Sequence, residues 1–188
     1  MHIPTCQTQE LEILTFEQAL VPTQWDFDRE KWLYIPDHYA EYRYLLGTRG
    51  ENPLICIGIN PSTAAPGDLD NTLKSVERIA AGNGYDSFLM FNVYAQRATR
   101  PDDMERVYNP ALHEENRKAF RYLLSLSPAP AVWAAWGNII MKRDYLIPCM
   151  ADFAADGAVG EIARLIDLRI AARQVVFQLE LRVGVHVD

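Results

Sequence analysis

Three short runs of apolar residues constrain the fold of this chain most strongly. They cover residues 54–59, 87–93 and 131–135, and polar or turn-forming residues follow each run at once. A continuous apolar run of this length is typical of a strand that is buried on both faces of a sheet. Segments with the apolar spacing of a helix lie between the runs. We therefore expect an α/β fold with a mainly parallel central sheet flanked by helices.

The segments around these runs complete the expected secondary structure. Residues 72–81 and 111–126 repeat apolar residues at helical spacing, and Gly82 and Gly84 end the first of these helices. Because helices separate the three runs, we expect the runs to be neighbouring parallel strands of one sheet. The other expected elements are a strand at 42–46 before turn residues 47–53, a helical stretch at 138–153 interrupted at Pro148, a helix at 158–173 and a half-buried strand at 175–187.

The length of 188 residues and the hydrophobic fraction of 49% fit one globular domain. We expect a single domain, 1–188, without internal repeats. In it, residues 1–40 form an irregular or partly helical lead-in, 41–150 form the core that carries the motifs, and 151–188 form a divergent C-terminal helix and strand.

The composition favours a cytoplasmic protein that does not span a membrane. No apolar run approaches the roughly 20 residues that a membrane helix needs, and the first twenty residues lack the order of a secretory signal. The three cysteines lie far apart, so we expect neither a disulfide framework nor a thiolate zinc site. The histidines, at positions 2, 38, 113 and 186, lack the spacing of metal ligands, so we expect no metal and no cofactor.

The formal net charge of −7 argues against a protein that coats nucleic acid, because that requires clustered lysine and arginine. An enzyme that binds a few phosphates locally is still compatible with this charge. The charge therefore weakens the prediction of a nucleic-acid ligand without removing it.

Polar residues gather where the three expected strands end. Ligands of open α/β sheets bind beyond the carboxyl ends of the strands, so these residues are the candidate site. The candidates are Asn60, Ser62, Thr63 and Asp70 after the first strand, Asn92, Arg97 and Arg100 after the second, and Trp136 after the third.

Each candidate also has a purely structural interpretation. Residues 60–63 are turn formers, Asn92 can make a structural hydrogen bond, and Asp70 can cap the following helix. Arg97 and Arg100 can be solvated surface residues, and Trp136 can close the core. The residues alone leave both interpretations open.

The order of these motifs resembles the DUF1643 family, from residue 54 to 141. That family shows a strand that ends in Asn-Pro-Ser, a downstream Asp-x-Thr, an Asn-bearing strand before Arg-Ala-Thr, and a later Trp-Gly. The matching residues here are 60–62, 70–72, Asn92 with 97–99, and 136–137.

The same layout is similar, more remotely, to the uracil-DNA glycosylase superfamily. Its mismatch-specific branch carries Gly-Ile-Asn-Pro in the loop that activates water, and this chain has the same four residues at 58–61. The superfamily's base-reading asparagine ends an apolar strand, as Asn92 does, and several members have Trp-Gly after a later strand, as at 136–137. The resemblance implies the three-layer architecture of these enzymes.

The C-terminal part departs from both families. Glycosylases of this superfamily carry His-Pro-Ser or Asn-Pro-Ser in a second loop that inserts into DNA, and DUF1643 proteins usually end with a His-Pro segment. This chain has no proline after Pro148, and its last histidine is His186. The second half of a glycosylase site therefore has no counterpart in the sequence.

The glycosylase resemblance implies a role for each candidate residue. Asn92 hydrogen-bonds the edge of an extrahelical base, Asn60 orients a water toward the sugar C1′, and Asp70 gives electrostatic or basic help. Trp136 lines the base pocket. The residues implied to hold phosphates are Ser62, Thr63, Arg97 and Arg100.

We therefore expect a glycosylase-like protein that binds a nucleobase or nucleotide and hydrolyses an N-glycosidic bond in DNA. One alternative is a non-catalytic module that binds nucleic acid or nucleotides. Another is a small-molecule nucleoside hydrolase or transferase on the same scaffold. The expected partner is nucleic acid or a nucleotide, and no membrane.

Overall fold

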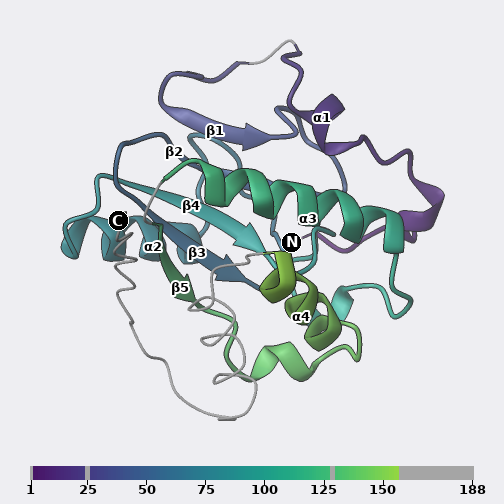
Figure 1. The fold of residues 1–188 in the computed structure, drawn as a ribbon. Helices are drawn as coiled ribbons and strands as arrows, with labels where there is room; N and C mark the ends of the chain where they lie inside the picture. Colours follow the sequence, from purple (N-terminus) through teal and green to yellow (C-terminus); the bar gives the residue numbers. More distant parts are fainter. Residues whose placement is uncertain (1, 24–25, 128–129, 157–188) are drawn as a thin grey trace, which may run out of the picture.

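A five-stranded sheet forms the centre of the computed structural model, which describes residues 2–23, 26–127 and 130–156. The strand order is β1-β2-β4-β3-β5 (Figure 1). The expected helix at 158–173 and strand at 175–187 lie outside the described residues. The strands are β1 (Trp32–Ile35), β2 (Leu45–Thr48), β3 (Pro53–Gly58), β4 (Ser87–Asn92) and β5 (Ala131–Ala134).

The three apolar runs form the parallel half of this sheet, as predicted. β3 pairs in parallel with β4 on one side and with β5 on the other. Every residue of β3 and β4 is buried, which explains why the sequence shows continuous rather than alternating apolar residues.

The other half of the sheet is antiparallel, so the expectation of a mainly parallel sheet is wrong. β1 pairs antiparallel with β2, and β2 pairs antiparallel with β4, which makes the sheet mixed. β1 lies in the segment expected to be an irregular or partly helical lead-in. The strand expected at 42–46 is shifted to Leu45–Thr48, and its last two residues were expected in a turn. Gly47 extends the strand because its missing side chain lets the backbone of β4 approach closely.

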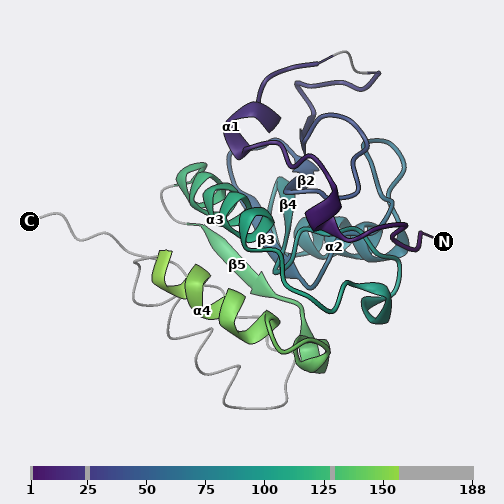
Figure 2. The ribbon, with the colours of Figure 1, turned by 90° about the vertical axis from the view of Figure 1, so that its right-hand side faces the viewer.

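Helices cover both faces of the sheet and make three layers. Leu73, Val76 and Ala80 of α2 (Asn71–Gly82) pack on one face. α3 (Pro110–Ser125), α4 (Leu146–Asp156) and the short α1 (Phe16–Ala19) pack on the other face. Figure 2 shows α2 on one side of the sheet and α3 with α4 on the other. The described residues contain no helix with the length and apolar character of a membrane span.

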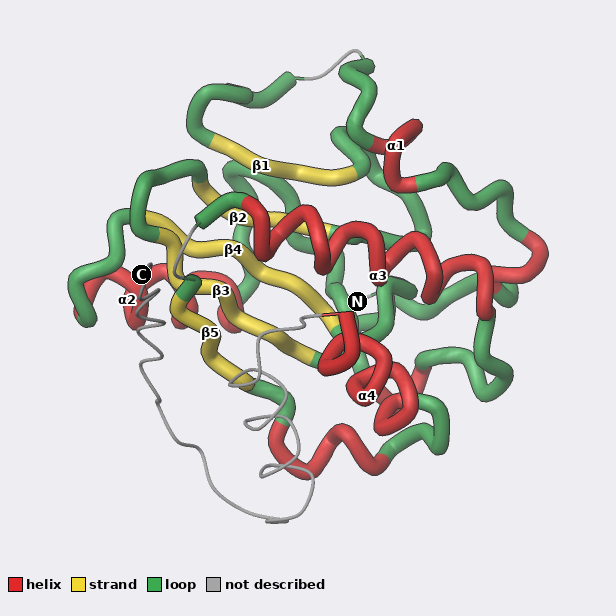
Figure 3. The backbone as a smooth tube through the Cα atoms, in the orientation of Figure 1, coloured by secondary structure: helices red, strands yellow, loops and turns green. Residues whose placement is uncertain are grey.

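The helical stretch after β5 breaks before Pro148, not at it. A 3-10 helix covers Gly137–Met141, and a loop separates it from α4 (Figure 3). Pro148 is the third residue of α4. In the first turn of a helix a backbone N–H has no intrahelical partner, so proline is tolerated there.

Candidate functional site

The ends of β3 and β4 form a topological switch point. After β3 the chain continues into α2 on one face of the sheet, whereas after β4 it continues into α3 on the opposite face. Two neighbouring strands whose connections leave in opposite directions mark the usual ligand site of an open α/β sheet. Gly58 and Asn92, the last residues of β3 and β4, are paired in register there.

Asn92 is buried at this switch point, with only 1% of its surface exposed. It lies two residues after Met90, so its side chain is on the α2 face of the sheet. A Cβ atom on Gly58 would stand 2.9 Å from Asn92 Nδ2 and 2.5 Å from Met90 Cε. The glycine in the Gly-Ile-Asn-Pro motif therefore makes room for the asparagine amide.

Arg43 fixes the orientation of this amide. Its Nη2 donates to Asn92 Oδ1 at 3.4 Å, a long hydrogen bond. Arginine has only donors, so the amide oxygen must face Arg43 and Asn92 Nδ2 must face away from it. Both Asn92 Nδ2 and Arg43 Nε are buried without a hydrogen-bond partner among the described residues.

A second buried arginine, Arg97, lies beside Arg43. The Nη1 atoms of both donate to Ala64 O, at 3.1 Å from Arg43 and 3.3 Å from Arg97. Neither arginine forms a salt bridge within the described part of the chain. Burial, together with the charge of Arg97, lowers the pKa of Arg43 to about 9. Two like charges held together without a salt bridge among the described residues make this interior electropositive, although the charge of Asp70 raises the pKa of Arg43 and so opposes the shift.

Arg97 holds the loop after β3 from within the protein, so its interpretation as a solvated surface residue is wrong. It has no exposed surface. Its Nη1 also donates to Ser62 O, its Nε donates to Ala40 O at 2.9 Å, and its Nη2 donates to Tyr34 Oη at 2.8 Å. The guanidinium thus joins the loop to β1 and to the segment before β2.

Asn60 and Asp70 are engaged in this loop as well. Asn60 Nδ2 donates to Ala98 O at 2.7 Å, which leaves Asn60 Oδ1 to accept a hydrogen bond. Asp70 caps α2 by accepting from Leu73 N at 2.8 Å, and its other oxygen accepts from the Ser62 hydroxyl at 2.5 Å. The capping interpretation of Asp70 is therefore observed, and both of its oxygens are occupied.

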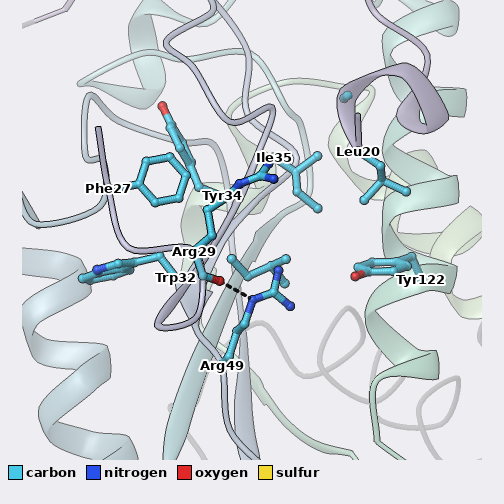
Figure 4. A pocket seen from close by; sticks show the side chains of 10 residues that line it. Leu20, Phe27, Arg29, Trp32, Tyr34, Ile35, Arg49 and Tyr122 are labelled. Atoms are coloured by element: carbon cyan, nitrogen blue, oxygen red, sulfur yellow. Dashed lines mark hydrogen bonds between the residues drawn. The ribbon is translucent and has the colours of Figure 1, made fainter. Parts of the chain in front are cut away.

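The remaining candidates do not join this buried cluster. Trp136 is buried in the core between the sheet and the α3–α4 layer, on the opposite face from Asn92. Thr63 and Arg100 are exposed on the surface. A pocket along β1, shown in Figure 4, is lined by none of the predicted site residues.

The sequence interpretation missed Arg43 and Tyr34. Arg43 stands between Tyr42 and Tyr44 in the segment expected to be a strand, and a charged residue among apolar ones there is itself a signal of a polar role. Tyr34 carries no such signal, because an aromatic residue in a short strand is ordinary.

Among the described residues, the cluster offers a ligand two buried donors without partners, together with the acceptor Asn60 Oδ1. Asn92 Nδ2 and Arg43 Nε both require an acceptor, such as a carbonyl or an anionic oxygen. An unpaired buried donor destabilises the fold by about 1–3 kcal/mol, so a ligand that supplies acceptors gains that energy on binding.

The comparisons with known proteins agree with the motif order. The family model described as "Protein of unknown function (DUF1643)" matches residues 43–152, a range that begins at Arg43 and contains Asn60, Asn92 and Arg97. No curated protein and no solved structure matches the chain. Because the match covers more than half of the 188 residues, this chain belongs to the DUF1643 family.

Proposed function

We propose that this protein binds a nucleobase at the ends of β3 and β4 and hydrolyses an N-glycosidic bond in DNA. The observation that carries the proposal is the buried amide of Asn92, whose Nδ2 lacks a partner among the described residues, at a topological switch point. Such an amide is the group that reads a base edge in enzymes that extract a base from the stack. The motif resemblance to uracil-DNA glycosylases supports the same site.

The orientation of Asn92 selects among bases. With its oxygen facing Arg43, the amide presents N–H to the ligand, and Arg43 Nε adds a second donor. These donors fit a base that carries oxo groups, such as uracil or hypoxanthine. Cytosine and adenine present an amino group at the corresponding position, which leaves donors facing donors.

Asn60 and Asp70 have separate roles in the proposed reaction. Asn60 Nδ2 is anchored on Ala98 O, so Asn60 Oδ1 is fixed and can orient a water for attack on C1′. Asp70 has both oxygens occupied and contributes its negative charge rather than acting as a base. That charge stabilises the positive charge that develops on the sugar.

The residues predicted to contact phosphates fall into two groups around the loop after β3. Arg97 is turned inward and positions the loop, whereas Ser62, Thr63 and Arg100 lie where a DNA backbone can reach them. Ser62 and Thr63 stand beside Ala64, whose carbonyl both arginines hold. A shift of this loop is required for a base to reach the buried Asn92.

A non-catalytic binding module is the second candidate. The observation that favours it is the absence of any proline after Pro148, since the second glycosylase loop carries one. Such a module would use the same donors for the base without the reaction.

The test separates binding from base release. Single- and double-stranded oligonucleotides containing uracil or hypoxanthine, matched oligonucleotides containing cytosine or adenine, and the corresponding free nucleosides are incubated with the protein. Binding is measured by calorimetry, and released base is measured by chromatography. We expect release from DNA by the parent protein, loss of release with retained binding for Asn60→Ala, and no change for the exposed control Asn138→Ala.

Three other outcomes contradict this expectation in different ways. Binding without release by the parent protein favours the module. Release from free nucleosides alone favours a nucleoside hydrolase or transferase. Equal binding of oxo bases and amino bases removes the specificity assigned to Asn92 and Arg43.

A further inference from the structure

Residues 2–7 form an arm that reaches the candidate site. At one end of this arm Thr8 is fully buried, and the Glu105 carboxylate accepts hydrogen bonds from Thr8 N at 2.8 Å and from the Thr8 hydroxyl at 2.6 Å. None of residues 3–7 is buried. At the other end His2 N donates to Thr99 Oγ1 at 2.6 Å, and His2 O accepts from Thr99 N at 3.0 Å. The arm is therefore anchored in the core at Thr8 and held at the surface by His2.

Thr99 directly follows the residues that hold the loop after β3. Ala98 N donates to Pro61 O at 2.9 Å, and the carbonyl of Ala98 accepts from Asn60 Nδ2 at 2.7 Å. The side chain of Arg97 binds two further carbonyls of the same loop. The arm therefore binds beside the residues on which the position of this loop depends.

The side chain of His2 adds two contacts to the same region. Its Nε2 lies 2.9 Å from Glu41 Oε2, and its Nδ1 lies 3.2 Å from the Tyr39 hydroxyl. The ring of Tyr39 in turn lies over the guanidinium of Arg97, with 4.6 Å between the ring centroid and Cζ. A cation and an aromatic ring attract each other at this distance. Through Tyr39, His2 therefore supports the arginine that holds the loop.

The arm opens more easily than the core that it joins. Segments with few buried apolar contacts and exposed hydrogen bonds open locally at a low cost in free energy. Asn92, by contrast, is only 1% exposed, so a ligand reaches its amide only after the loop after β3 has moved. The arm is thus the part of the closed site that is simplest to release.

We propose that residues 2–7 are a latch that keeps the loop after β3 closed, and that release of His2 lets this loop open and exposes Asn92 to a ligand. The latch is an autoinhibitory contact, and it rests on the proposed function for the identity of the ligand. Because the ligand binds the open state, weakening the latch raises the open fraction and increases the apparent affinity by the same factor.

Amide hydrogen exchange of peptides covering residues 60–70 measures the opening of the loop without any ligand. We expect His2→Ala, which removes both side-chain contacts, and Thr99→Val, which removes the hydroxyl acceptor, to raise this exchange at least about threefold. Ile3→Ala is the matched control, because Ile3 is 56% exposed in the same arm, and it should exchange like the parent protein. The latch is overturned if both variants exchange like the parent, or if peptides from α3 accelerate equally, since that would be global destabilisation.

Binding separates the latch from the proposed function. A single-stranded oligonucleotide containing uracil should bind His2→Ala about threefold more tightly than it binds the parent protein or Ile3→Ala. Faster exchange with unchanged binding would remove the autoinhibitory role. If no variant binds the oligonucleotide, the proposed function fails, whereas faster exchange confined to the loop still supports the latch.

Discussion

At the scale of single residues, the polar cluster depends on how Asn92 and Arg43 share their hydrogen-bonding groups. Arg43 and Arg97 are buried together, and their nearest acceptors are neutral oxygens of the backbone, a phenol and an amide. Uncharged acceptors balance a buried positive charge less well than a carboxylate does. In the proposed function the amide of Asn92 serves two purposes: its oxygen accepts a hydrogen bond from Arg43, and its nitrogen, which has no partner among the described residues, is left for the ligand.

Two substitutions of Asn92 separate these purposes. Asn92→Asp keeps an oxygen on Arg43 and adds a negative charge beside two guanidinium groups, so we expect the free energy of unfolding at neutral pH to hold or rise. Asn92→Leu leaves Arg43 Nη2 without an acceptor and should lower the free energy of unfolding by about 1–3 kcal/mol. Urea unfolding monitored by circular dichroism measures both. Equal destabilisation by the two changes would contradict the orientation of the amide.

At the scale of elements, the sequence predicts the parallel half of the sheet because its strands are buried on both faces. Continuous apolar runs identify β3, β4 and β5, and helical spacing with capping residues identifies α2 and α3. β1 was missed because its four residues lie among acidic neighbours and are too few to show the periodicity of a strand. Its strand character comes from pairing with β2, a tertiary interaction that no local pattern reports.

The candidate site, like the sheet, could be predicted only in part from the sequence. Asn92 and Arg97 are linked through Arg43 and Ala64 O, and Asn60 bonds the residue after Arg97, because the ends of the parallel strands β3 and β4 meet at one edge of the sheet. Arg43 comes from the segment before β2, and its place in the cluster depends on the antiparallel pairing of this segment's strand with β4, which was not foreseen. Trp136 was expected to line the same pocket, but it continues the alternation of Val132 and Ala134, which pack toward α3 and α4 on the face opposite Asn92.

Gly47 tests the contact that joins the two halves. A Cβ atom there would stand 2.0 Å from the backbone oxygen of Phe88, which cannot move without breaking the β2–β4 pairing. Gly47→Ala should lower the free energy of unfolding by more than about 2 kcal/mol. Gly82→Ala is the matched control, because no atom lies within 4 Å of its Cβ position at the end of α2. Gly82→Ala should leave the free energy of unfolding unchanged or raise it by about 0.5–1 kcal/mol. Thermal unfolding compares the two, and a tolerated Gly47→Ala would refute the close approach.

At the scale of the whole molecule, polar links hold α4 against α3 over the face of the sheet opposite α2. Arg117 forms a bidentate pair with Asp156, with both contacts at 2.7 Å. His113 of α3 is 2% exposed, and its Nε2 lies 2.9 Å from Asp152 Oδ2 of α4. Burial lowers the pKa of His113 below its usual 6.5, although Asp152 opposes this shift. We therefore expect the contact between α3 and α4 to weaken in mild acid.

The direction of this pH response follows from the lowered pKa of His113. His113 takes up a proton less readily in the folded chain than in the unfolded chain, so its contribution to stability is full above pH 6.5 and is lost as the pH falls below that value. At about pH 8 we expect the free energy of unfolding of the parent protein to be higher than that of His113→Gln. This difference should become smaller as the pH falls toward about 5. Urea unfolding of both proteins across this range measures the difference, and the paired comparison cancels every other titrating group. A difference that stays constant or grows as the pH falls would show that His113 is not held in its neutral form between α3 and α4.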